Sequence, residues 1–583
     1  MYENTFPYNF ILSFFFGFFF IISNVLFSIC VAKNETIRKK FFFKEFQPII
    51  IFFLIFCLYT FVLNIIVIYN YKNLSFIIFS IFILQTLFIF KNFVSLKSLI
   101  YFNLKIDEKF ILLVFFSLFL ISILPMSDAD SMSIYQYLPI TIYNEGLGKI
   151  DLMQNLEFTL LSNTEIILLF SSIFKSENLG AQLNLITLLF FILIKFKDHK
   201  NFSLVILSSP LIIYFISTQK LQLFFGLIFL LLYILVKRDL IKKKFELFIF
   251  ILLLVFYSSG KFSYILITIP LYFYFFYKNL KNYKYIILYS VLSFIIVYVP
   301  LLSIKQIYFN NIFAPFFENF FGQGMEAYNA FVFDMRRNAG WLSNPGNISL
   351  YFKPFISFEL SSISSSLGLI FLLMIINLKL HRTTKYFAII IIIFVLLTGQ
   401  ILPRYYFEAF LLLAFFYKPG NYFIKLLIYS QISVIFLFSL VYIYISYIKL
   451  DVIDNKLNYM NKFTYSFFDS RQIKDINLNG NILDYSLPRH SIFFNKNVYS
   501  MRYISILDQY NNNVVNNSLT FIDKNSIKYL IVQSAEKLPS CILVKEIGKT
   551  YRQHAVRNFL TKHKKAKYKI FEIKDNKCDN EIK

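Results

Sequence analysis

The stretch FQPIIIFFLIFCLYTFVLNIIVIY, residues 46–69, decides the fold, because it carries no charged side chain over a length that can cross a membrane. A transmembrane α-helix needs about 20 predominantly apolar residues. Similar segments recur along most of the chain and predict a polytopic α-helical membrane protein with roughly fourteen transmembrane helices. The other segments lie near 10–32, 74–91, 109–125, 179–195, 202–217, 221–236, 247–260, 262–277, 284–302, 363–380, 386–401, 405–418 and 422–448.

Composition excludes the soluble classes of protein. Of the 583 residues, 57% are hydrophobic and 16% are charged, against about 25% charged in a soluble globular chain. The mean hydropathy is +0.61. The net charge of +25 does not indicate a nucleic-acid partner, because most Lys and Arg residues sit in short runs between apolar segments. Cys30 and Cys57 lie inside apolar runs and are expected to be inert core residues.

The basic runs predict how the chain is oriented. They follow odd-numbered apolar segments, so all of them lie on one side of the membrane, which the positive-inside rule assigns to the cytoplasm. Both termini are then expected on the extracytoplasmic side. The first segment, near 10–32, is too long for a signal-peptide core and lacks a preceding basic region, so we expect a retained helix.

Three regions are expected outside the membrane on that same side. The loop 126–178 is acidic, and its apolar part 158–174 is predicted to lie on the membrane surface, since counting it as a span would invert every later loop. The second region is 303–362. The tail 449–583 is long and polar enough for a small extracytoplasmic α/β domain, with strands predicted at 481–485, 529–532, 542–547 and 568–573.

Two cysteines flank the last two predicted strands. If these strands pair antiparallel, Cys541 and Cys578 reach the same edge of the sheet. An oxidising compartment permits a disulfide between them. Two unpaired surface thiols are the alternative.

The sharpest motif is PMSDADSMSIYQYLP, residues 125–139, directly after the fourth segment. In an extended chain, residues i and i+2 point the same way, so Asp128 and Asp130 can reach one substrate or one cation. Partial desolvation would suit such a carboxylate to general-base catalysis. The alternative is structural, with Asp128, Asp130 or a neighbouring serine capping the helix that follows.

Isolated cations recur on the same predicted face. Lys220, Lys261 and Arg404 each lie in a short hairpin near the hydrocarbon boundary. A cation at that depth needs an anionic partner, which can be a nearby carboxylate, a lipid headgroup or a phosphate-bearing substrate. Arg404 is the strongest phosphate candidate, because a guanidinium makes bidentate contacts.

These residues resemble the glycosyltransferase C superfamily, distantly like the protein mannosyltransferases and aminoarabinose transferases. Members carry acidic residues in the first outward loop, directly after a transmembrane helix. This chain reads Asp128-Ala-Asp130-Ser-Met-Ser-Ile-Tyr135, then Pro139 and Asn144-Glu-Gly146. It departs from the pattern in having Ile134-Tyr135 where one subgroup has Tyr-His, and in placing the loop after the fourth span. Residues 1–108 would then be extra N-terminal helices, followed by a core over 109–448 and the domain 449–583.

The resemblance implies inverting transfer of a sugar from a polyprenyl-phosphate donor, on the outer face of a bacterial plasma membrane, to an envelope lipid, glycan or protein. It implies Asp128 and Asp130 as base or as ligands of a divalent cation such as Mg or Mn, with Glu165 as a further carboxylate. Lys220, Lys261 and Arg404, with Arg336 and Arg337 from the loop 303–362, would hold the lipid phosphate.

Other classes of membrane protein stay open as alternatives. A transporter or flippase of lipid-linked saccharides would handle a similar substrate, but it should show internal repeats and charges near the bilayer midplane. The chain shows no convincing repeat, and its notable charges cluster at one face. A polymerase or ligase of surface polysaccharide would share both substrate and topology with the transferase.

Overall fold

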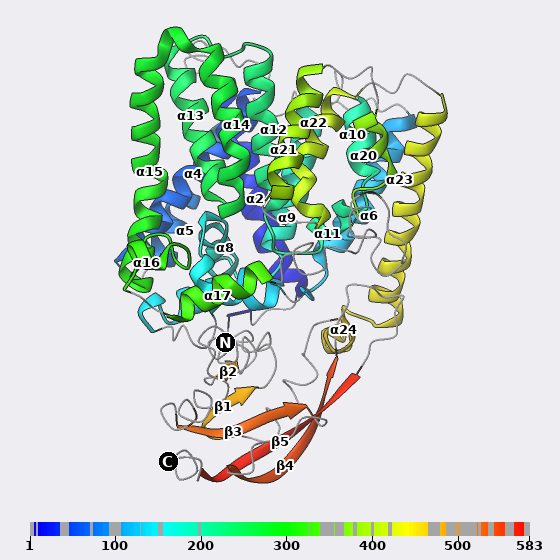
Figure 1. Ribbon diagram of the computed structural model, residues 1–583. Coiled ribbons are helices and arrows are strands. Elements are labelled where there is room, and N and C mark those ends of the chain that lie inside the picture. The colour runs from blue at the N-terminus through cyan, green and yellow to red at the C-terminus, as the bar shows by residue number, and fades with distance from the viewer. Residues whose placement is uncertain are drawn as a thin grey trace.

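The structure is a computed structural model, and its helices form a bundle with a separate C-terminal sheet below it (Figure 1). The residues it describes are 5–6, 10–34, 46–69, 74–92, 106–128, 130–149, 156–195, 200–323, 326–337, 355, 366–376, 382–397, 402–417, 422–463, 478–484, 498–500, 522, 526–533, 542–553 and 565–576.

Most of the predicted apolar segments form helices. The first four are α2 (Phe10–Lys33), α4 (Gln47–Ile68), α5 (Leu74–Lys91) and α6 (Ile106–Ile123). Those of the middle of the chain are α9 (Leu179–Lys195), α12 (Gln222–Lys237), α13 (Lys244–Ser259), α14 (Phe262–Lys278) and α15 (Tyr283–Phe309). The last are α20 (Leu369–Ile376), α21 (Arg382–Leu397), α22 (Phe407–Phe416) and α23 (Tyr422–Ile443), which continues into the π-helix η8 (Tyr444–Lys449).

Four helical segments among the described residues are long and apolar enough to cross a membrane: Ile11–Lys33, Gln47–Ile68, Leu280–Phe309 and Tyr422–Lys449. Fourteen spans are not confirmed, because several helices are shorter than a span requires. The segment predicted at 202–217 is two short helices, α10 (Lys200–Leu207) and α11 (Leu211–Ile216). They separate at Pro210, whose ring and missing N–H interrupt a helix.

Apolar side chains on the outside of the bundle agree with a membrane environment. Along α15 and α23, large apolar residues recur with roughly half of their surface exposed, a pattern that water would penalise and lipid tolerates. Examples are Ile287, Val291, Ile295, Val434 and Leu437.

Two of the basic hairpins, those with Lys237 and Lys278, lie together at one end of the bundle. Lys237 donates a hydrogen bond of 2.9 Å to Thr383, which joins the hairpin after α12 to the start of α21. Lys278, at the end of α14, pairs with Asp239 at 2.7 Å. The acidic loop 126–178 lies at the opposite end, where Ser13 in α2 donates to the carbonyl of Lys175 at 2.9 Å.

The acidic loop folds into short elements: η2 (Ser131–Tyr135), α7 (Tyr137–Asn144), η3 (Leu147–Lys149), η4 (Leu156–Leu160) and α8 (Asn163–Ile173). The prediction of a helix lying on the membrane surface is wrong for α8. Every residue of α8 is buried, and the helix packs between α4, α7 and α9. At 11 residues it is too short to span a bilayer, and the alternation of the loops stays a prediction.

The loop 303–362 also carries helical elements. Beyond the end of α15 it forms α16 (Glu318–Phe321) and α17 (Glu326–Arg337). Two short 3-10 helices complete the connections of the bundle, η5 (Leu280–Asn282) before α15 and η7 (Pro403–Tyr406) before α22. In Figure 1, α16 and α17 lie at the end of the bundle that faces the sheet.

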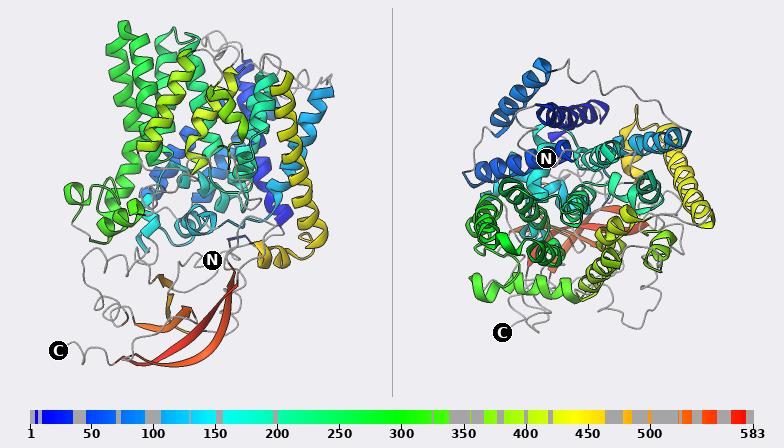
Figure 2. Two further views of the ribbon diagram at one scale, coloured as in Figure 1. Left: turned by 45° about the vertical axis from the view of Figure 1, so that its right-hand side comes forward. Right: turned by 90° about the horizontal axis from the view of Figure 1, so that it is seen from above.

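The C-terminal domain contains a five-stranded sheet in the order β2-β1-β3-β5-β4, seen beneath the bundle in Figure 2. Its strands are β1 (Asn481–Asp484), β2 (Val498–Ser500), β3 (Ile527–Gln533), β4 (Ile542–Gln553) and β5 (Lys565–Asn576). β1 is parallel to β2 and β3, whereas β5 is antiparallel to β3 and β4. The four predicted strands are confirmed, and β2 is an additional one.

The antiparallel pairing of β4 and β5 is the arrangement on which the disulfide prediction depended. Ile542 pairs with Asn576, so the residues beside Cys541 and Cys578 meet at one end of the hairpin. The two cysteines lie outside the described residues, and the disulfide stays a prediction. Cys30 and Cys57 are buried and unpaired, as expected.

A short helix ties the tail to the acidic loop. α24 (Lys456–Phe463) follows α23 and carries Lys456, which pairs with the buried Glu177 at 2.9 Å. Tyr459 of α24 hydrogen-bonds Tyr442 of α23 at 2.7 Å. The chain therefore leaves the bundle at the end where the acidic loop lies.

Candidate functional site

The two aspartates of the motif have different surroundings. Asp128 is buried, and its carboxylate accepts hydrogen bonds from the backbone N–H of Ser131 at 2.9 Å and from the Ser131 hydroxyl. It therefore satisfies the first backbone N–H of η2, the structural role that the alternative predicted, although the N-cap position of this helix belongs to Asp130, whose side chain makes no capping bond. The chain is helical at Asp130 and beyond, and the two carboxylates have different partners, Asp128 bonding to Ser131 and Asp130 pairing with Lys220 and Arg404.

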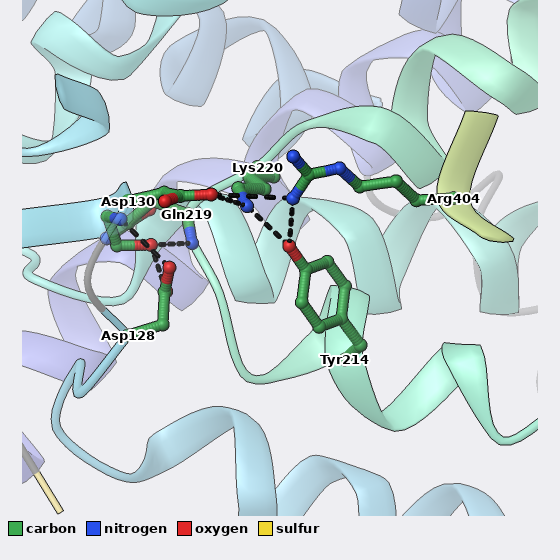
Figure 3. A network of polar contacts seen from close by, with 7 residues as sticks. Asp128, Asp130, Tyr214, Gln219, Lys220 and Arg404 are labelled. Atoms are coloured by element: carbon green, nitrogen blue, oxygen red, sulfur yellow. Dashed lines mark hydrogen bonds and ion pairs between the residues drawn. The ribbon is translucent and has the colours of Figure 1, made fainter. Parts of the chain in front are cut away.

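Asp130 lies in a compact network of charges (Figure 3). Its Oδ2 pairs with the ammonium of Lys220, and with Nη1 of Arg404 at 3.4 Å. The hydroxyl of Tyr214 accepts from the same two cations, at 2.7 Å from Arg404. The side chains of Lys220, Arg404 and Asp130 are 5%, 20% and 31% exposed. Partial burial strengthens these attractions relative to a surface ion pair.

Backbone contacts fix the hairpin that carries Lys220. Asn184 of α9 donates to the carbonyl of Lys220 at 2.7 Å and accepts from the N–H of Phe224 at 3.0 Å. The N–H of Gln219 donates to Ser131 Oγ at 3.0 Å, the hydroxyl that also donates to Asp128. Hydrogen bonds thus join the aspartate motif to the lysine hairpin.

A cavity of about 460 Å³ lies beside this network. Its polar wall includes Lys220, Lys261, Glu165, Ser162 and Tyr405. The remaining wall is mostly apolar and comes from η2, α14, α17 and the segment before α16. It includes Ile134, Leu160, Phe262, Leu266, Phe316, Phe317, Val332 and Met335. The lining therefore offers two cations to an anion and a large apolar surface to a hydrophobic group.

Glu165 is the one carboxylate of the described residues that lines this cavity. It belongs to the capping box of α8, in which its Oε2 accepts from the N–H and the hydroxyl of Ser162 at 2.7 and 2.5 Å. α8 lies outside the four candidate spans. Burial raises the pKa of Glu165 to about 7, against the lowering effect of the Ser162 hydrogen bonds. A carboxyl that titrates near neutral pH suits proton transfer.

Tyr405 links the cavity to the cations. Lys261 Nζ lies 4.5 Å from its ring centroid, and the Arg404 guanidinium lies 5.4 Å from it. Burial alone would raise the pKa of the Tyr405 phenol, but the positive charges of Lys261, Arg404 and Lys220 lower it to about 7. The phenol therefore titrates near neutral pH as a neighbour of all three predicted phosphate-binding cations.

The structure brings together five of the eight predicted site residues: Asp130, Glu165, Lys220, Lys261 and Arg404 surround or adjoin the cavity. Asp128 is near but acts as a cap. Arg336 and Arg337 are the last residues of α17, next to Met335 of the cavity wall, and their side chains lie outside the described part of the chain.

The two aspartates do not fit a shared divalent cation in this arrangement. Both oxygens of Asp128 accept from Ser131, and Asp130 already neutralises two positive side chains. A divalent ion between them would meet Lys220 and Arg404 at close range. A search of the described residues finds no group of three or more His, Cys, Asp or Glu side chains that could hold a metal ion.

Sequence reasoning missed two tyrosines of the site, Tyr214 and Tyr405. Both lie in aromatic-rich apolar runs among 41 tyrosines, so residue type alone did not mark them. The signal that could have found them is position, since Tyr214 lies six residues before Lys220 and Tyr405 adjoins Arg404. A tyrosine beside a boundary cation can supply both a ring face and a hydroxyl.

Comparison with protein-family models, with curated proteins and with solved structures finds no match to this chain. The functional interpretation therefore rests on the site itself.

Proposed function

We propose that the chain is a membrane glycosyltransferase that moves a sugar from a polyprenyl-phosphate donor to a cell-envelope acceptor on the outer face of a bacterial plasma membrane. The observation that carries the proposal is the cavity of about 460 Å³, whose lining combines the cations Lys220 and Lys261 with a mostly apolar wall. A lipid-linked sugar phosphate has the same division between an anionic and an apolar part.

Lys261 and Lys220 hold the donor phosphate in this proposal, and Arg404 adds its positive charge from the adjoining network. Lys220 and Lys261 line the cavity, whereas Arg404 pairs with Asp130 and lies 5.4 Å from the ring centroid of Tyr405. Their charges stabilise the negative charge that grows on the phosphate as it leaves. Asp130 is a positioning residue, since it orients Lys220 and Arg404 before the substrate arrives.

Glu165 is the general base in this proposal. The acceptor hydroxyl oxygen attacks the anomeric carbon while the bond from that carbon to the phosphate oxygen breaks. The hydroxyl proton passes to Glu165, and the electron pair of the broken bond leaves with the polyprenyl phosphate. Because the attack comes from the face opposite the phosphate, the anomeric configuration inverts.

The test is transfer by the purified protein in lipid vesicles, with radiolabelled polyprenyl-phosphate sugars as donors and an envelope extract as the source of acceptor. Label should move into a new product in the wild type, and Lys261→Ala should raise the KM for donor by about tenfold or more, as loss of a charged hydrogen bond implies. Lys281→Ala is the matched control, because Lys281 is exposed at the opposite end of the bundle.

Other outcomes would assign the cavity to another class of protein. Movement of intact donor between leaflets, without release of polyprenyl phosphate, would make the chain a flippase. Growth of a saccharide carried on a lipid diphosphate would instead make it a polymerase or ligase. Absence of transfer from every donor in the panel, with the protein folded, would overturn the transferase.

A further inference from the structure

A second, smaller cavity adjoins the first on the side of α21 and α22. Its volume is about 20 Å³, enough for one water molecule or one small polar group. The two cavities share lining residues, namely Gln222, Ser263, Tyr264, Leu266 and Tyr405. The small cavity is therefore a recess in the wall of the large one rather than a distant void.

Two polar side chains of this recess have no hydrogen-bond partner of normal geometry among the described residues. They are both carboxylate oxygens of Glu408, in the first turn of α22, and the hydroxyl of Ser263, in the first turn of α14. Glu408 is fully buried. Burying such groups unpaired costs several kcal/mol in general, so the arrangement is costly unless another molecule supplies the missing bonds.

The neighbours of Glu408 relieve this cost only in part. Tyr257 acts on the carboxyl through a side-chain hydrogen bond and Lys261 acts through its charge, but the Tyr257 hydroxyl itself is buried without a partner of normal geometry among the described residues, and Lys261 is also placed over the ring of Tyr405. The apolar lining of the recess comes from Leu266, Ile267, Phe394 and Val395, and its other polar lining from Gln222, Tyr264 and Tyr405. A group that entered the recess would thus find Glu408 and Ser263 as hydrogen-bonding partners whose own bonds are unmade.

We propose that Glu408 and Ser263 form a subsite that receives one hydroxyl group of the sugar bound in the large cavity. A hydroxyl both donates and accepts, so it can donate to the Glu408 carboxyl and accept from Ser263 Oγ at the same time. The subsite selects sugars that carry a hydroxyl at the matching ring position, because a deoxy analogue leaves both protein groups unpaired. This inference rests on the proposed function for the identity of the ligand, but not for the existence of the subsite.

The experiment compares donors that differ in one hydroxyl. Farnesyl-phosphate-linked hexoses and pentoses, together with their monodeoxy analogues, are offered to the wild type, Glu408→Gln and Ser263→Ala. The wild type should discriminate against one deoxy analogue by about tenfold to a hundredfold in kcat/KM. In both variants the ratio of kcat/KM for the hydroxylated donor to kcat/KM for the deoxy donor should fall toward one. Their kcat/KM for the deoxy donor should stay close to that of the wild type.

Thr268→Val is the matched control, because the Thr268 hydroxyl donates within α14 to the carbonyl of Tyr264 at 2.8 Å and lines neither cavity. It should keep the wild-type ratio. Ser263→Ala is the decisive variant if Glu408→Gln fails to fold, since it removes one oxygen near a helix start.

A second readout needs no turnover. The same compounds should raise the thermal unfolding temperature of the detergent-solubilised protein, and the advantage of the hydroxylated compound should disappear in Ser263→Ala. Equal discrimination in wild type and variants would show that the recess holds only water, and would overturn the subsite while leaving transfer intact. Selective stabilisation without any transfer would support the subsite and overturn the proposed reaction.

Discussion

Replacing Glu165 by glutamine tests the assignment of the general base most directly. Glutamine keeps the size and the acceptor oxygen of the side chain, and it forms the same capping box with a serine. The contacts of 2.7 and 2.5 Å from Ser162 to Oε2 can therefore persist in the variant. The ability to take a proton is lost, so an effect on rate reports chemistry rather than folding.

The expected loss of rate in Glu165→Gln follows from the role of Glu165 as general base. A general base contributes a factor of about 10² to 10⁴ to the rate, which corresponds to about 3 to 5 kcal/mol of transition-state stabilisation. With a pKa of about 7, roughly nine tenths of the carboxyl is ionised at pH 8 and roughly one tenth at pH 6. The wild-type kcat/KM should therefore fall about tenfold per pH unit on the acidic side of neutrality.

The assay is the initial rate of label transfer in vesicles between pH 5.5 and 9, for the wild type, Glu165→Gln and the control Glu145→Gln. Glu145 belongs to the same acidic loop but does not line the cavity. We expect Glu165→Gln to lose at least about a hundredfold in kcat while its unfolding temperature and donor binding stay close to those of the wild type. Near-normal turnover with an unchanged acidic limb would refute the assignment, and Asp130 would become the candidate base.

Three further predictions concern residues around the cavity and in the tail. The wild-type KM for donor should rise above pH 7, because the Tyr405 phenolate formed there competes with the donor phosphate for Lys261. Tyr405→Phe should remove this rise. Identical pH profiles of KM in the two proteins would contradict the prediction. Asp128→Asn should keep most of the transfer rate, since the asparagine side chain also accepts a bond from a helix N-terminus. Asp128→Ala should lower the free energy of unfolding by about 1 kcal/mol, which thermal denaturation would measure. Cys541 and Cys578 should resist a thiol reagent until reduction, and labelling of both without reductant would exclude the disulfide.

The sequence predicted most of the helices of the bundle, because apolar helices are marked by local features. Length, apolarity and charge distribution are properties of short segments, and the hairpins with Lys237 and Lys278 lie together at the end opposite the acidic loop. The two predictions about the bundle that were wrong, the single span at 202–217 and the surface helix at 158–174, also have local causes. Pro210 divided one predicted span into α10 and α11, and α8 had the apolar composition of a surface helix although neighbouring helices cover it on all sides.

The chemistry of the acidic motif could not be decided from spacing. Asp128 and Asp130 are two residues apart in either conformation, but an extended chain would align their side chains and the observed helical turn separates them. Sequence reasoning gave capping as an alternative, and the structure assigns that role to Asp128 alone. The partners of Asp130, by contrast, lie 90 and 274 positions away in Lys220 and Arg404.

The sequence by itself determined that this is a multi-helix membrane protein with an acidic motif and sparse cations on one face. Hydropathy and charge can be summed over short segments, so these features can be predicted without knowing which distant residues are in contact. Only the tertiary structure decided that Lys220, Lys261, Glu165 and Tyr405 line one cavity, and that Glu408 borders a recess beside it. Convergence of separate hairpins depends on how helices pack, and packing is a property of the whole bundle that no single segment carries.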